Sequence, residues 1–146
     1  MTAPGPGQIL FAFVRHWSRR PPTSEGKLAE QGRLVLVTEA AHSLTQRGIA
    51  ATVNALAHEI GIDQSGASRL VKSATEAEYL TMQASETDGR RRQASVTASG
   101  RALLEQAHRW QEEVFGRLTE DWSEQQRRDF QRAMTDLIDR SYALGT

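Results

Sequence analysis

The chain has 146 residues, with 18 basic and 18 acidic side chains, so its formal net charge is zero. This length suits one domain with a sizeable core, and the balanced charge argues against a protein that coats nucleic acid through a broad positive field. The absence of cysteine excludes disulfides, thiolate metal sites and cysteine redox sensing. No apolar run approaches the roughly 18 residues of a membrane span, and no secretory signal is visible, so we expect a cytoplasmic protein that does not contact membranes.

Two helices are expected in the first third of the chain. Gln8–Arg20 carries apolar residues on one wide face, and Pro21-Pro22 ends this helix because proline disfavours helical backbone at the residue before it. The second helix is expected over Glu25–Gln46, and Arg47-Gly48 is the predicted helix stop.

The stretch from Val53 to Leu70 (VNALAHEIGIDQSGASRL) has the pattern of two short helices joined by a tight turn. Ala57 lets the second helix cross closely over the first, and Gly61 accepts the left-handed backbone of the turn without a Cβ clash. The pattern indicates a helix-turn-helix, whose second helix normally enters the major groove of DNA, although such units also occur as plain core packing. The apolar residues expected to hold the two helices together are Leu56, Ile60, Ile62, Ala67 and Leu70.

Polar residues mark where the helices are expected to begin. Thr52 is the candidate N-cap of the first helix of this unit, and Asp63 and Ser65 are both candidates for the second, which reaches about residue 77. Thr97 can cap a helix from residue 98 to about residue 118. Ser123 begins a capping box for the last helix, which is expected to carry Phe130, Met134, Leu137, Ile138 and Tyr142 on one face.

A β-hairpin is expected between the helix-turn-helix and Thr97. Tyr79–Ala84 and Arg91–Thr97 have the pattern of strands, and the Asp-Gly pair in Glu86–Gly89 suits a hairpin tip. A hairpin placed directly after a helix-turn-helix is a wing. The expected fold is therefore mainly α (α+β): a winged helix-turn-helix with a β-hairpin wing, flanked by N- and C-terminal dimerisation helices.

We expect a single domain over 1–146, with the DNA-binding region at 31–98 and dimerisation helices at 8–30 and 99–146. The first and last helices carry more apolar residues than one small winged domain can cover. Pairing with a second copy would cover them and would also present two recognition helices to two half-sites. The alternative is that these helices fold back onto their own winged domain.

The second helix of the unit and the wing carry the residues expected to contact DNA. Gln and Arg side chains can pair with adenine and guanine edges, whereas serines and a helix N-terminus suit phosphates. Arginines in a wing can enter a minor groove, although such a run is usually a solvated surface. Asp88 has the wrong charge for DNA and is expected to pair with a wing arginine and fix the loop. The expected DNA-binding residues are Thr52, Gln64, Ser65, Gly66, Ser68, Arg69, Lys72, Arg90, Arg91 and Arg92.

Motifs for catalysis, metal binding or a cofactor are missing from the sequence. The four histidines are far apart, and neither a glycine-rich phosphate loop nor a G-x-S-x-G sequence occurs. We therefore expect no enzyme, no metal and no cofactor. Trp17, His42 and Trp110 are candidates for lining a small-molecule site, although aromatic residues at helical spacing are more often part of a core.

Two segments resemble the multiple antibiotic resistance regulator (MarR) family. LAHEIGIDQSGASRLV is similar to the helix-turn-helix motif of that family, and DGRRRQASVTASGRALL to its wing motif, where Asp88, Arg90, Val96, Thr97 and Gly100 fall on the pattern. The resemblance implies a homodimer with interlocked terminal helices, bound to a pseudo-palindromic operator in double-stranded DNA, with Arg90 in the flanking minor groove. Most members are repressors, and many are released by small phenolic or lipophilic ligands.

The sequence departs from the family pattern at three places. Glu78 stands where the family has a glycine after the recognition helix, which predicts a strained or differently shaped junction. Met82 replaces the usual basic residue at the start of the wing strand, and Pro21-Pro22 breaks the N-terminal helix, so its dimer contacts are expected to differ. Glu78 and the zero net charge slightly favour an alternative function, a winged-helix protein–protein interaction module that does not bind DNA.

Overall fold

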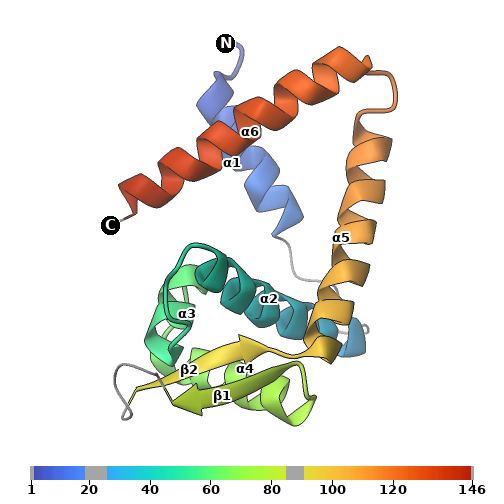
Figure 1. The fold of residues 1–146 in the computed structure, drawn as a ribbon. Coiled ribbons are helices and arrows are strands. Elements are labelled where there is room, and N and C mark those ends of the chain that lie inside the picture. Colours follow the sequence, from blue (N-terminus) through green and yellow to red (C-terminus); the bar gives the residue numbers. More distant parts are fainter. Residues whose placement is uncertain (1, 19–25, 85–90, 146) are drawn as a thin grey trace. The chain divides into compact units, whose positions relative to one another are not determined.

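The structure is a computed structural model that describes residues 2–18, 26–84 and 91–145 (Figure 1). These residues form two compact units, Met1–Leu104 and Glu105–Thr146. None of the helices in the described ranges is both long enough and apolar enough to cross a membrane. The elements are α1 (Pro6–Trp17), α2 (Gly26–Gln46), α3 (Val53–Ile60), α4 (Gln64–Glu76), β1 (Leu80–Ala84), β2 (Arg92–Val96), α5 (Ala98–Leu118) and α6 (Glu124–Leu144).

Short polar residues begin the helices where the sequence predicted. The Thr52 hydroxyl accepts from the backbone N–H of Ala55 at 3.1 Å and caps α3. At α4 the cap is Asp63, whose carboxylate accepts from the N–H of Gly66 at 2.8 Å, while Ser65 lies inside the helix. The predicted capping box at Ser123 is confirmed.

The prediction for the first helix was wrong at both ends. α1 starts at Pro6, two residues before the expected Gln8, because proline is tolerated at the first position of a helix, where its missing N–H has no partner to lose. The Gln8 side chain accepts from the N–H of Gly5 at 2.8 Å and closes the first turn. The helix ends at Trp17, three residues before the expected Arg20, and Pro21-Pro22 lies outside the described residues.

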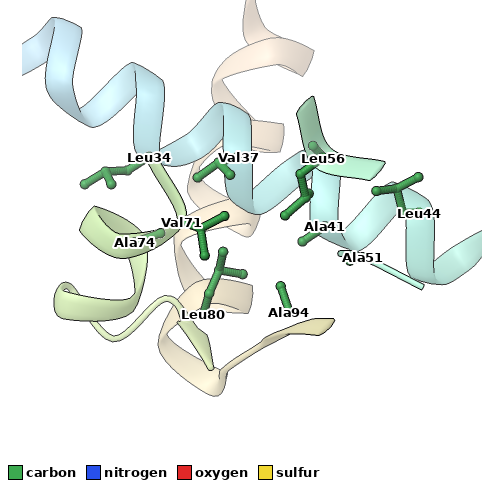
Figure 2. Packing of buried hydrophobic residues seen from close by; sticks show 11 residues of the cluster. Leu34, Val37, Ala41, Leu44, Ala51, Leu56, Val71, Ala74, Leu80 and Ala94 are labelled. Atoms are coloured by element: carbon green, nitrogen blue, oxygen red, sulfur yellow. The ribbon is translucent and has the colours of Figure 1, made fainter. Parts of the chain in front are cut away.

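The core of the first unit is built by side chains from α2, α3, α4 and the hairpin, which point toward one another in Figure 2. Val37, Leu56 and Leu80 are fully buried within it. β1 and β2 pair antiparallel, with Leu80 opposite Val96 at one end of the ladder. The hairpin is joined to the rest of this core through the N–H of Ala94, which donates to the carbonyl oxygen of Ala51 at 2.8 Å.

One residue predicted for the helix-turn-helix core is exposed. Ile62 follows the left-handed Gly61, and its side chain is 38% exposed, so the prediction that it packs between the helices was wrong. Its backbone N–H still completes the turn by donating to the carbonyl oxygen of Ala57 at 3.0 Å. Leu56 and Ala67 are fully buried as expected, and Ile60 and Leu70 pack against the core while half-buried.

The second unit contains most of α5 and all of α6. The guanidinium of Arg127 donates to the carbonyl oxygen of Thr119 at 2.6 Å from Nη2 and to the hydroxyl of Thr119 at 3.1 Å from Nε, which fixes the connection between the helices. The ring of Phe130 stacks on that of Phe115, with 6.0 Å between centroids. Beyond this contact, the apolar face expected on the last helix is exposed at Met134, Leu137 and Ile138.

Candidate nucleic-acid interface

The helix-turn-helix is held together by small buried residues on both helices. Ala57 of α3 is 7% exposed, and Ala67 of α4 is fully buried. Between them Gly61 adopts φ 81°, the left-handed conformation that favours glycine. The chain therefore turns tightly from α3 into α4, and the position of α4 is fixed by the same core that holds the hairpin.

α4 has one buried and one exposed face. Ala67, Val71 and Ala74 are buried and recur at steps of four and three. The residues that the sequence predicted as DNA contacts lie on the other side, at steps that keep them on one face of a helix. The exposed side chains of this face are Gln64, Ser65, Ser68, Arg69 and Lys72.

Three of the predicted DNA contacts have local structural roles. Gly66 is half-buried beneath the cap of α4, where a Cβ would lie 2.7 Å from Oδ1 of Asp63. The Ser65 hydroxyl donates to Oδ2 of Asp63 at 3.2 Å, so its proton is directed at the carboxylate. Thr52 is half-buried and uses its hydroxyl to cap α3. The first turn of α4, where the exposed face begins, is therefore held by local hydrogen bonds.

The wing supplies two further exposed arginines. Arg91 and Arg92 are both exposed at the start of the return strand. Nη2 of Arg92 donates to the carbonyl oxygen of Met82 at 3.3 Å, across the hairpin. The predicted contact Arg90 and the predicted loop-fixing residue Asp88 lie outside the described residues.

The junction between α4 and β1 is strained, one of the two outcomes expected from the departure of Glu78 from the family pattern. Glu78 adopts φ 66°, a left-handed conformation that side-chain-bearing residues rarely adopt. Its N–H donates to the carbonyl oxygen of Thr75 at 3.0 Å, and the N–H of Tyr79 donates to that of Ala74 at 2.9 Å. These two bonds form the Schellman motif, in which glycine is the usual left-handed residue.

Replacing Glu78 by glycine should therefore stabilise the fold. The left-handed conformation costs a residue with a Cβ about 1–2 kcal/mol, and the extra freedom of glycine in the unfolded chain offsets part of the gain. We expect Glu78→Gly to raise the free energy of unfolding by about 0.5–1 kcal/mol in urea denaturation. Glu105→Gly, in exposed helical backbone, is the matched control and should lower it by about 1 kcal/mol. If Glu78→Gly lowers the free energy of unfolding, the backbone at Glu78 is not strained.

Sequence reasoning missed one contact that positions the helix-turn-helix. The guanidinium of Arg47, at the end of α2, forms an ion pair with the carboxylate of Glu59 on α3. Both side chains are largely buried, at 26% and 19% exposure. The two residues are 12 positions apart and the chain turns between them, so helical spacing gives no signal for this pair.

The three candidates for a small-molecule site lie in different parts of the fold. Trp17 is on α1, where its ring centroid lies 5.6 Å from that of His16, and His42 is half-buried on α2. Trp110 is 57% exposed on α5, in the second unit. Their role as ligand contacts stays a prediction.

Taken together, the two crossed helices, the tight turn and the antiparallel hairpin define a winged helix-turn-helix protein. Residues 29–91, which run from α2 into the wing, match the model of the MarR family. Over this segment the chain is similar to the MarR family, and it shares its fold with solved MarR family proteins. None of the curated proteins compared with the chain matches it significantly.

Several solved structures have the same fold at low sequence identity. A MarR family transcriptional regulator from Silicibacter pomeroyi superposes with a TM-score of 0.64 at 17% identity, covering 94% of this chain and 89% of that chain. Staphylococcus aureus MepR in complex with DNA gives 0.57 at 18%, covering 90% and 97%. Bordetella bronchiseptica BpsR, whose DNA binding is regulated by 6-hydroxynicotinic acid, gives 0.51 at 17%, covering 73% and 74%.

Proposed function

We propose that the chain is a transcription regulator that binds a specific sequence in double-stranded DNA. The observation that carries this proposal is the exposed face of α4, where Gln64, Arg69 and Lys72 project from a helix whose opposite face is locked into the core. A rigid helix with amide and guanidinium groups on its outer face suits base edges in a major groove. The DNA complex of MepR, which has the same fold, supports the assignment. Such a regulator needs no cofactor and catalyses no reaction.

Lys72→Ala should weaken DNA binding by removing a phosphate contact. The test uses a duplex selected by the full-length protein from a pool of random sequences, with affinities measured at several salt concentrations. We expect the slope of log affinity against log salt to fall by about one unit. Arg109→Ala, which removes the same charge from an exposed position on α5, is the control and should leave the slope unchanged.

Two outcomes of this experiment would count against the proposal. If the selection enriches no sequence and affinity does not depend on salt, the chain fits the alternative, a winged-helix protein–protein interaction module. The zero net charge and the altered junction at Glu78 are the observations that slightly favour that alternative. If Lys72→Ala and Arg109→Ala flatten the slope equally, the exposed face of α4 is not the DNA-binding surface.

We further propose that the regulator acts as a homodimer. α1 has no buried residue, and its large apolar side chains are between 37% and 68% exposed. Those of α6 from Phe130 to Ile138 are between 39% and 48% exposed. Apolar faces of this extent on two terminal helices are costly in water, and a second copy would cover them. A symmetric pair also places two recognition helices on a pseudo-palindromic operator.

The remaining proposal is that the protein is a repressor released by a small lipophilic or phenolic ligand. The regulation of BpsR by 6-hydroxynicotinic acid, an aromatic acid, supports a ligand of this class. We expect 6-hydroxynicotinic acid or phenol to lower the affinity for the selected duplex. Trp110→Ala should bind that duplex as the parent does but lose the response. A parent protein whose affinity neither compound changes would contradict a ligand of this class.

A further inference from the structure

Thr97 lies where three elements meet: the end of α4, the start of β1 and the start of α5. Its hydroxyl donates to the carbonyl oxygen of Glu78 at 2.5 Å and accepts from the N–H of Gly100 at 2.9 Å. Its own N–H donates to the carbonyl oxygen of Tyr79 at 3.1 Å. One residue thus holds two consecutive carbonyl groups after the recognition helix while it caps the helix that follows the wing.

The packing around Gly100 makes this junction tight. Gly100 is buried in the first turn of α5, and a Cβ there would lie 2.8 Å from Cγ1 of Val96 and still closer to the carbonyl oxygen of Tyr79. Leu103 and Leu104, one turn later, are also buried. The first turns of α5 therefore rest directly on the backbone that leaves α4.

The left-handed residue Glu78 lies inside the same junction. Glu78 holds φ 66° although it has a Cβ, and its carbonyl oxygen is the one that the Thr97 hydroxyl binds. A left-handed residue with a side chain persists only where its surroundings hold it. The Thr97 hydroxyl is such a restraint, because rotation of the peptide after Glu78 would break its hydrogen bond.

We propose that Thr97 is a positioning residue that locks the direction of α4 to the direction of α5. This inference rests on the proposed function, since it concerns how two recognition helices keep the separation that an operator demands. The first turn of α5 belongs to the same compact unit as α4, so the proposed lock acts within that unit. A loosened junction would let each α4 adjust to half-sites that are wrongly spaced.

The test compares the affinity of the full-length protein for two duplexes. The first is selected from random duplexes about 30 base pairs long, which hold two half-sites one helical turn apart. The second has one base pair inserted at its centre. The parent should prefer the first, and Thr97→Val, which keeps the shape but loses the hydroxyl, should reduce that preference by about fivefold or more. Thr97→Ser, which keeps the hydroxyl, should retain the parent's preference.

Matched variants separate positioning from loss of stability. Ser123→Ala also removes an N-cap hydroxyl, that of α6, and should leave the preference unchanged. Glu78→Gly relieves strain while it keeps the carbonyl group that Thr97 binds, so it should retain the preference. The double variant Glu78→Gly with Thr97→Val should regain stability in urea unfolding but not the preference, which keeps the test valid if Thr97→Val folds poorly.

The outcomes distinguish this inference from the function beneath it. If the parent enriches no duplex, the proposed function fails and the inference fails with it. If the parent discriminates between the duplexes and the folded double variant discriminates equally well, only the positioning role is overturned. A loss of preference in Ser123→Ala equal to that in Thr97→Val would assign the effect to stability and would also overturn it.

Discussion

Gly100→Ala is expected to lower the free energy of unfolding by about 2–3 kcal/mol, the cost of forcing an extra carbon into a packed core. The added Cβ would meet Cγ1 of Val96 and the carbonyl oxygen of Tyr79. Neither can move away easily, because the Tyr79 oxygen is backbone that accepts from the N–H of Thr97, and Val96 is paired with Leu80 in the hairpin. Urea unfolding followed by circular dichroism measures the loss.

Gly116 provides the matched control on the same helix. It is exposed, and a Cβ added there would meet nothing within 4 Å. Gly116→Ala should raise the free energy of unfolding by about 1 kcal/mol, because alanine loses less backbone entropy in a helix. If the two substitutions shift stability in the same direction, the packing described for the first turn of α5 is wrong.

The helix-turn-helix could be predicted from the sequence because its signals act over a few residues. Thr52 and Asp63 each cap a helix through the N–H three residues ahead, and Gly61 takes the left-handed conformation on its own. The altered junction at Glu78 was predicted from the family pattern, which has a glycine at this position of the helix end. Local backbone chemistry thus defines most of the element boundaries between residues 47 and 97.

Contacts between distant residues gave no such signal. The Arg47–Glu59 ion pair and the hydrogen bond from Thr97 to Glu78 join residues 12 and 19 positions apart, and both depend on how the chain folds between them. The prediction that Ile62 packs between the helices was wrong for the same reason. The direction of its side chain depends on the path of the chain from Gly61 into α4, which no periodicity describes. The start of α1 was predicted wrongly because proline, which ends helices elsewhere, is also tolerated at the first position of a helix.

The candidate site also combines features that the sequence predicts with features that it does not. The outer face of α4 follows from helical period, because the buried residues Ala67, Val71 and Ala74 leave the residues between them outside. The hydrogen bond that directs the Ser65 proton at Asp63 could not be foreseen, since Ser65 was itself a candidate for the cap. Helical period therefore places the predicted contacts on one face, but their hydrogen-bonding state needs the structure.

Leu137→Glu is expected to convert the proposed homodimer into monomers. Leu137 is 46% exposed in the single chain, so a carboxylate there would remain hydrated in a monomer at little cost. In a dimer that covers this face of α6, the same carboxylate would be buried without a partner, which costs several kcal/mol. A loss of about 3 kcal/mol weakens association by roughly 100-fold. Sedimentation velocity at micromolar concentration should show the parent at twice the 16.2 kDa chain mass and the variant near that mass.

Thr135→Glu is the control for this substitution, because it adds the same charge to the same helix. Thr135 is exposed and lies two positions before Leu137, which places it on a different side of α6. We expect Thr135→Glu to sediment as the parent does, and both variants to keep the helical circular dichroism of the parent. Loss of the dimer in Leu137→Glu should also abolish binding to the selected duplex, since one recognition helix alone contacts only half of the operator. A parent that sediments as a single chain, or a Leu137→Glu variant that stays paired, would show that this face of α6 is not the dimer interface.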